Sequence, residues 1–204
     1  MAIQYTLIAI GDVILQSAVN LLGTKVMAAV SVVSRILYLA AQPLEAMGVT
    51  MGTYCAQNRG INDLGRIRKG IRTGGVMCLF YVAVMNLLLH MVLPYVVPLF
   101  MDGEATEVLG YVRRYILICG PCYVFVAFIL IFRNGLQGCG FGWIPVVGVV
   151  IEVSARSGVT IVLGGRGGLE GICAAHCTAW ISSGLSFVLL YMVLMRRMGQ
   201  AKRE

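Results

Sequence analysis

The stretch AAQPLEAMGVTMGTYCAQNRG, residues 40–60, combines the features that decide the fold. It is largely apolar, yet it places Pro43 and Glu45 in its middle and ends on the polar sequence Gln-Asn-Arg-Gly. A proline inside a helix removes a backbone donor and bends the helix. A carboxylate in apolar surroundings needs a polar partner or a wet cavity. The stretch therefore predicts a bent helix that crosses an apolar medium beside a cavity and leaves that medium near residue 57.

The composition of the whole chain identifies the apolar medium. Of 204 residues, 59% are hydrophobic and 12% are charged, against about 45–50% and about 25% in soluble domains. A bilayer core of ~30 Å requires ~20 apolar residues per helix. We therefore predict an all-α integral membrane protein, one domain over residues 1–204, with six transmembrane helices at about 3–22, 27–55, 76–100, 115–132, 143–163 and 169–195.

Basic residues gather on one side of the predicted spans. Ten follow the second, fourth and sixth spans: Arg59, Arg66, Arg68, Lys69, Arg72, Arg133, Arg196, Arg197, Lys202 and Arg203. The opposite connections hold four, diluted by acids: Lys25, Arg113, Arg114 and Arg166. By the positive-inside rule, both termini are expected in the cytoplasm, with the chain in the plasma membrane, the inner membrane of a bacterium. The net charge of +7 is thus explained by contact with membrane lipids, and no nucleic-acid partner is expected.

Five ionisable residues fall inside the predicted spans: Asp12, Arg35, Glu45, Glu152 and Arg156. Each would cost roughly 2.5–3.5 kcal/mol at a helix centre facing lipid. They are therefore expected to face protein or a wet cavity, and they are the candidate residues for coupling to a proton or another cation.

Helical spacing supports this interpretation. In the second span, polar residues separated by 4, 3, 4 and 3 draw one stripe: Ser31, Arg35, Tyr38, Gln42 and Glu45. In the first span, Asp12, Gln16 and Asn20 draw a second stripe. In the fifth span, Glu152 and Arg156 stand at i,i+4 and can pair directly.

Counting the charges predicts an unpaired acid. If Glu152 pairs with Arg156, only Arg35 is left for Asp12 or Glu45. Arg35 and Glu45 are ten residues apart, about 15 Å along one helix, which is too far for a direct pair. One carboxylate is then expected to lack a partner and to take up a proton near neutral pH.

Five motifs, taken in order, resemble the multidrug and toxin extrusion (MATE) family. They are Ile10-Gly-x-Val-Ile-Leu-Gln-Ser-x-Val-Asn20, Pro43 with Gly48, Ala56-Gln-Asn-x-Gly60 before Arg66-Ile, Phe132-Arg-Asn-x-Leu-Gln-Gly-x-Gly140 and Glu152-x-x-x-Arg156. The resemblance covers nearly the whole chain and corresponds to the second half of the family's sequence.

This resemblance implies a transporter of twelve spans in two six-helix lobes, of which the chain supplies the C-terminal lobe. It implies export of organic cations or drugs in exchange for protons or sodium by alternating access, without enzyme chemistry, organic cofactor or metal site. Matched to family positions, Gln57, Asn58 and Gly60 fall in the cytoplasmic loop after the lobe's second helix, and Arg133 and Gln137 fall near the inner end of a later helix. Asp12 departs from the small polar residue expected there. The missing first lobe is expected as a partner, encoded in frame upstream of Met1.

Two other functions remain open. A flippase for lipid-linked sugars, from a related superfamily, would favour a basic cavity, whereas acids here outnumber bases three to two inside the spans. A membrane thiol oxidoreductase would use Cys119 and Cys122, but that motif needs a strand before it, a helix after it and solvent access. Gly120-Pro121 between these cysteines instead predicts a bend. The spacing of Cys119, Cys122, Cys173, His176 and Cys177 would also permit a zinc site, which the apolar surroundings disfavour.

Overall fold

The computed structural model describes residues 2–100, 105–164 and 167–200, and in these ranges the chain is helical and contains no strand. The helices are α1 (Ala2–Asn20), α2 (Thr24–Gly60), α3 (Leu64–Val96), α4 (Ala105–Cys119), α5 (Tyr123–Gly138), α6 (Ile144–Val159) and α7 (Gly168–Gln200). A 3-10 turn, η1 (Val97–Phe100), extends α3, and a π-helical turn, η2 (Thr160–Gly164), extends α6. The structure does not describe Asp102, Glu104, Arg166, Lys202 or Arg203, which lie outside these ranges.

These helices correspond in order to the six predicted spans. Four of them, α2, α3 with η1, α6 with η2, and α7, are long and apolar enough to cross a membrane, and α4 with α5 forms a fifth span in two parts. The remaining helix, α1, is shorter. The predicted fold class is therefore confirmed.

One helix extends well beyond its predicted span. The third span was expected to begin at 76, but α3 begins at Leu64. The side chain of Asp63 accepts a hydrogen bond from the backbone N–H of Arg66 at 2.9 Å and caps the helix. The basic residues that follow are good helix formers, so α3 continues beyond its apolar part.

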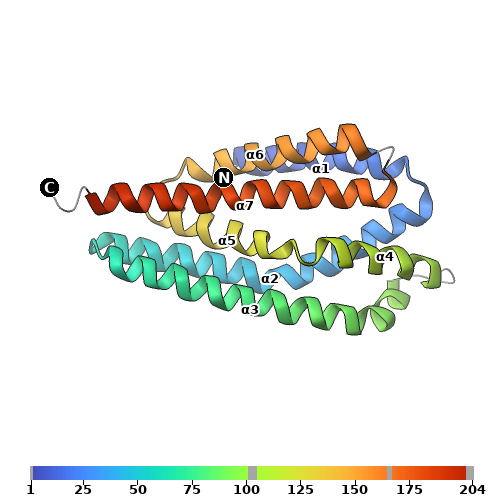
Figure 1. Ribbon diagram of the computed structural model, residues 1–204, viewed down its shortest axis with the longest axis horizontal. Helices are drawn as coiled ribbons and strands as arrows, with labels where there is room; N and C mark the ends of the chain where they lie inside the picture. Colours follow the sequence, from blue (N-terminus) through green and yellow to red (C-terminus); the bar gives the residue numbers. More distant parts are fainter. Residues whose placement is uncertain (1, 101–104, 165–166, 201–204) are drawn as a thin grey trace.

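The helices form an antiparallel bundle whose order in space differs from their order in sequence (Figure 1). The neighbour relations run from α1 to α6, then α7, α5, α2 and α3. The α2–α3 turn, the end of α5 and the end of α7 share one end of the bundle, at the left of Figure 1. Seven described basic residues of the α2–α3 turn, α3 and α7 therefore gather at that end.

The expected bend at Gly120-Pro121 is present. The axes of α4 and α5 meet at 54°, across a break between Cys119 and Tyr123. The amide of Asn86, on α3, donates to the carbonyl of Gly120 at 3.0 Å and to Val82 at 3.0 Å. The Gly120 carbonyl, which also accepts from the backbone N–H of Tyr123 at 3.1 Å, thus has a second donor, a side chain inside the bundle.

Small residues set the closest helix crossing. A Cβ added at Gly138 on α5 would lie 2.1 Å from the backbone oxygen of Gly52 on α2. Such backbone proximity is typical of helix interfaces in membranes. On the other side of the bundle, the ring of Phe187 on α7 fills the space beside Gly148 on α6. These two contacts hold α2, α5, α6 and α7 in fixed positions.

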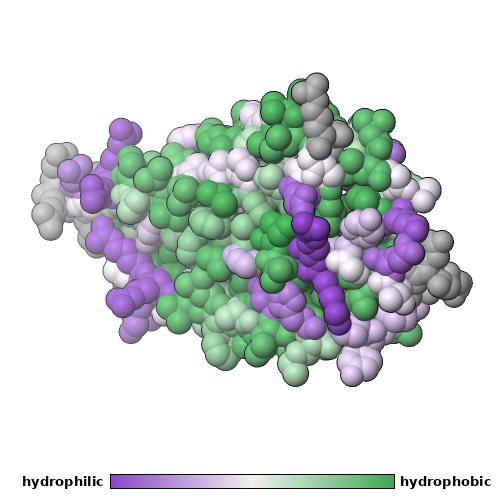
Figure 2. Space-filling view, turned by 45° about the vertical axis from the view of Figure 1, so that its right-hand side comes forward, coloured by the Kyte–Doolittle hydropathy of each residue, from purple (hydrophilic) through white to green (hydrophobic). Residues whose placement is uncertain are grey.

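The surface supports the membrane assignment. Figure 2 shows a broad hydrophobic area in the middle of the molecule, with hydrophilic side chains gathered toward both ends. Many large apolar side chains of the long helices are exposed, including Phe80, Leu87, Met91 and Leu189. A surface of this kind is stable against lipid rather than water.

Candidate functional site

A cluster of three charged side chains lies between α1 and α6. The guanidinium of Arg156 donates through Nη1 to a carboxylate oxygen of Asp12 at 2.5 Å and through Nη2 to Glu152 at 2.6 Å. The Arg156 side chain is 8% exposed, that of Glu152 15% and that of Asp12 58%. One buried arginine is thus shared by a buried carboxylate and by a carboxylate that opens onto the flank of the bundle.

Local sequence explains this geometry. Glu152 and Arg156 are one turn apart on α6 and share a face. Gly11 precedes Asp12 on α1, and a Cβ there would lie 3.3 Å from the Val153 methyl groups. The absent side chain lets α1 approach α6, which brings Asp12 to Arg156.

The structure corrects the predicted charge count. The Glu152–Arg156 pair is confirmed, but Asp12 pairs with the same arginine and not with Arg35. The expectation of an unpaired acid was wrong for these three carboxylates, because Glu45 lies 3.8 Å from Arg133. Sequence reasoning placed Arg133 at the inner end and did not consider it as a partner.

The Glu45–Arg133 pair joins α2 to α5 and differs from the first cluster. Its side chains are 49% and 24% exposed, and its separation of 3.8 Å is longer than a good hydrogen bond. It depends on the α2–α5 crossing at Gly52 and Gly138. Gln137, one turn after Arg133 on α5, is partly buried.

Both predicted polar stripes lie on exposed surface. On α2, Ser31, Arg35, Tyr38, Gln42 and Glu45 are all exposed. On α1, Asp12, Gln16 and Asn20 are exposed, and the Gln16 amide donates to Asn20 at 3.0 Å. The first two helices, α1 and α2, therefore both present polar side chains outward at the depth of the apolar spans.

Arg35 lies on this surface without an ion pair among the described residues. It lines a cavity of about 450 Å³ with Ser34, Tyr38 and Leu39. A positive charge exposed at this depth would be costly in lipid, so the surface of α2 is suited to a polar lining and not to a lipid contact.

Pro43 lies inside the single helix α2, which continues from Thr24 to Gly60. Two carbonyls in the turn before it receive side-chain donors: the Gln42 amide donates to Tyr38 at 3.2 Å, and the Tyr81 hydroxyl donates to Ala40 at 2.7 Å. These bonds compensate a helix that a proline weakens. The predicted bend beside Glu45 stays a prediction.

The Gln57-Asn58-Arg59-Gly60 segment forms the end of α2 at the basic end of the bundle. Asn58 is buried and its amide donates to the Tyr54 carbonyl at 2.8 Å, whereas Gln57 and Gly60 are exposed. Asn62 follows with φ of 55°, a left-handed conformation that asparagine tolerates. This motif therefore ends one helix and turns the chain into α3.

Sequence reasoning missed a buried polar group between α4 and α7. The Tyr115 hydroxyl lies 2.9 Å from Nδ1 of His176, and Trp180 contacts the same imidazole edge-on. The other ring nitrogen of His176 is buried without a hydrogen-bond partner, as are Nε of Arg156 and Oγ1 of Thr160. No sequence spacing links these residues, because they meet only through helix packing.

The cysteines do not form the redox site that the spacing permits. All seven are free. Cys119 is buried at the end of α4 with its sulfur 3.8 Å from that of Cys177, and Cys122 lies within the break, just before α5. No strand precedes them in the described ranges. Across those same residues, no set of three or more Cys, His, Asp or Glu side chains has the geometry to hold a metal ion.

The fold and these charges define a class: a multi-pass membrane protein whose helices carry intramembrane charges. A sequence model of the MatE family matches residues 1–164. The chain therefore belongs to the MatE family of transporters. Among curated proteins, none matches this sequence.

Solved transporters share the fold. A MATE protein in complex with MaL6 superposes with a TM-score of 0.89 at 14% identity, over 97% of this chain and 45% of that one. The outward-facing conformation of a multidrug resistance MATE transporter gives 0.87 at 14% identity, over 97% and 45%. A MOP superfamily transporter from Pyrococcus furiosus gives 0.88 at 14% identity, over 96% and 44%. The chain thus spans less than half the length of these structures.

Proposed function

We propose that the chain is one lobe of a secondary transporter that exports organic cations or drugs by alternating access, in exchange for protons or sodium ions. The observation that carries this proposal is the Asp12–Arg156–Glu152 cluster. It places two carboxylates on one arginine inside the spans, with Asp12 open at the flank. A net negative group of this kind can take up a cation.

The sharing of Arg156 suits an exchange of partners. Leaving a buried charge without a partner is strongly destabilising. When Asp12 binds a proton or a sodium ion, Arg156 keeps Glu152 at 2.6 Å. The coupling cation therefore binds and leaves without stranding the buried arginine, which is what a reversible coupling site requires.

The exposed polar stripes support a second lobe as the partner. Residues of α1 and α2 at the depth of the apolar spans would be unfavourable against lipid. Covered by a first lobe, they would line a polar cavity between the two lobes. The gathering of basic residues at the end of α7 supports cytoplasmic termini in a bacterial inner membrane. The native DNA upstream of Met1 is then expected to encode six further spans in frame.

The test is efflux of a fluorescent organic cation from everted membrane vesicles that contain the complete transporter. A pH gradient or a sodium gradient applied separately identifies the coupling ion. Asp12→Asn is expected to lower the gradient-driven rate about tenfold, and Glu45→Gln less. Ser17→Ala is the matched control, because Ser17 lies outside both polar stripes and its hydroxyl bonds only within α1, to Val13. Unchanged efflux and pH dependence in both acid variants would remove these carboxylates from the mechanism.

Arg35 favours a second candidate function, the lipid-linked sugar flippase. This exposed arginine lines a cavity, and with Arg133 included the acids no longer outnumber the arginines inside the spans. A phosphate group could bind such a site. Tight binding of a pyrophosphate-linked lipid that Arg35→Gln abolishes would reverse the ranking of the two functions.

A further inference from the structure

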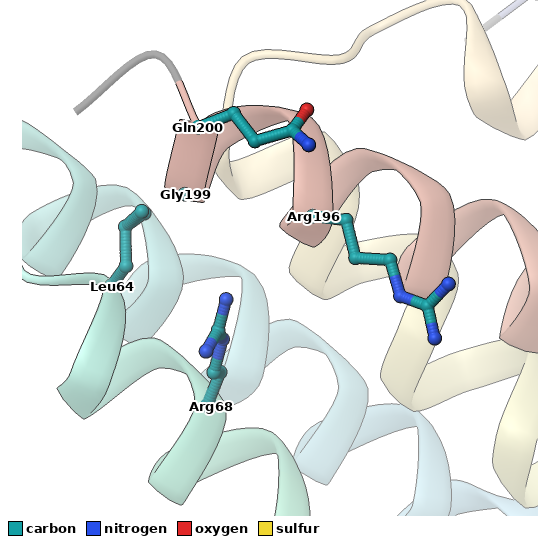
Figure 3. A pocket seen from close by; sticks show the side chains of 5 residues that line it. All are labelled: Leu64, Arg68, Arg196, Gly199 and Gln200. Atoms are coloured by element: carbon teal, nitrogen blue, oxygen red, sulfur yellow. The ribbon is translucent and has the colours of Figure 1, made fainter. Parts of the chain in front are cut away.

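A cavity at the basic end of the bundle has the features of an anion site. It lies between the first turns of α3 and the last turns of α7, has a volume of about 400 Å³ and is lined by Leu64, Arg68, Arg196, Gly199 and Gln200 (Figure 3). We call it the α3–α7 cavity. It is separate from the charge clusters of α1, α2, α5 and α6.

Arg68 is held in place within this cavity. Its Nη2 donates to the backbone carbonyl of Met195 at 3.2 Å, which ties α3 to α7. A Cβ added at Gly199 would lie 3.3 Å from the same nitrogen, so the glycine leaves the guanidinium open on that side. Figure 3 shows the Arg68 side chain directed from α3 toward the last turn of α7. A guanidinium has five N–H donors, so this single bond leaves Arg68 able to bind an anion.

The charge around the cavity is strongly positive. The α2–α3 turn, the start of α3 and the end of α7 carry seven described cations: Arg59, Arg66, Arg68, Lys69, Arg72, Arg196 and Arg197. The single described acid there is Asp63, whose carboxylate caps the backbone of Arg66. Neither Arg68 nor Arg196 forms an ion pair with another described residue. Among the described residues, the cavity therefore has no acidic side chain paired with its arginines.

The position of the cavity selects an amphipathic ligand. It lies where the polar end of the bundle meets the apolar spans, and the buried Leu64 forms its apolar wall. Further along α3, Val76, Met77 and Phe80 are more than half exposed and give the helix an apolar surface within the predicted span. A phosphate held by the arginines would let acyl chains lie along this surface.

We propose that the α3–α7 cavity binds the phosphodiester headgroup of an anionic phospholipid, with Arg68 and Arg196 as its phosphate-binding residues. Basic pockets between helices at this membrane boundary are suited to anionic headgroups, and arginine binds phosphate through paired N–H donors.

The test is native mass spectrometry of the full chain released from micelles that contain phosphatidylglycerol and phosphatidylcholine. The measured quantity is the ratio of the two bound lipids. The double variant Arg68→Gln/Arg196→Gln is expected to lower the preference for phosphatidylglycerol about thirtyfold, since each basic residue contributes about a factor of five. The matched control is Arg66→Gln/Arg72→Gln, which removes the same charge from the same end of the bundle but leaves the cavity lining intact. Its loss of preference is expected to be clearly smaller than that of Arg68→Gln/Arg196→Gln.

Each remaining outcome decides the proposal. Equal losses in both double variants would mean diffuse attraction to the surface, and an unchanged ratio in Arg68→Gln/Arg196→Gln would exclude the cavity. A millimolar excess of inorganic phosphate should leave the ratio of the two bound lipids unchanged. If phosphate abolished the preference for phosphatidylglycerol, the ligand would be a soluble phosphate and the lipid assignment would be wrong. If the arginine variant does not fold, Gly199→Leu fills the cavity while keeping both charges and should also lower the ratio. Retention of the preference by Gly199→Leu would then contradict the proposal.

Discussion

The two intramembrane charge groups of this lobe differ in burial and therefore in what they contribute. Arg156 is 8% exposed and satisfies two carboxylates at 2.5 and 2.6 Å, whereas Glu45 and Arg133 are 49% and 24% exposed and lie 3.8 Å apart. A buried charge is costly to leave alone, but an exposed pair adds about 0–1 kcal/mol. The comparison separates a group that the stability of the fold depends on from one that contributes little to it.

The largest expected effect comes from removing the shared arginine. Arg156→Met leaves Asp12 and Glu152 side by side without a counter-charge and should lower the free energy of unfolding by about 3–5 kcal/mol. Chemical denaturation of the chain in mixed micelles measures this change. Arg133→Met is the matched variant and should cost less than about 1 kcal/mol. If Arg156→Met and Arg133→Met lowered the free energy of unfolding by similar amounts, the two charge groups would not differ in what they contribute to stability.

The next largest effect is expected where α2 and α5, the helices that carry the Glu45–Arg133 pair, cross each other. Gly138→Ala places a methyl group 2.1 Å from the Gly52 oxygen, so α2 and α5 must move apart. Overpacking of this kind costs about 1–3 kcal/mol. Gly142→Ala is the control, because nothing lies within 4 Å of its added Cβ. Chemical denaturation measures the free energy of unfolding of both variants. An unchanged value for Gly138→Ala would show that α2 and α5 are not closely packed at this crossing.

A double-mutant cycle tests whether the two carboxylates share Arg156. Asp12→Asn and Glu152→Gln should each be tolerated, because the arginine keeps one partner. The double variant strands the buried guanidinium, so the two changes should differ from additivity by about 1–2 kcal/mol. Additive unfolding free energies would mean that the two acids act independently.

The smallest effect is expected at the Glu45–Arg133 pair itself. Glu45→Gln should change the free energy of unfolding by less than about 1 kcal/mol, because the carboxylate is half exposed. Thr50→Val, on an exposed face of the same helix, serves as the reference. A loss comparable to that of Arg156→Met would show that Glu45 is satisfied by more than Arg133.

The fold was more predictable than the partners of its charged residues. Hydropathy located the spans, and Gly120-Pro121 predicted the break between α4 and α5 because proline acts on the local backbone. The i,i+4 spacing correctly paired Glu152 with Arg156. It could not pair Asp12 with Arg156, 144 residues away, or Tyr115 with His176. Those contacts depend on how closely helices approach, which glycines such as Gly11 decide.

The break between α4 and α5 has a consequence for how the protein enters the membrane. With 15 and 16 residues, the two halves are only about 22 and 24 Å long, short of the ~30 Å hydrocarbon core. Neither half can cross alone, and the Asn86 amide, on a helix made earlier during synthesis, donates to the Gly120 carbonyl at the break. The order of translation therefore makes α3 available as a packing partner when the fourth span is inserted.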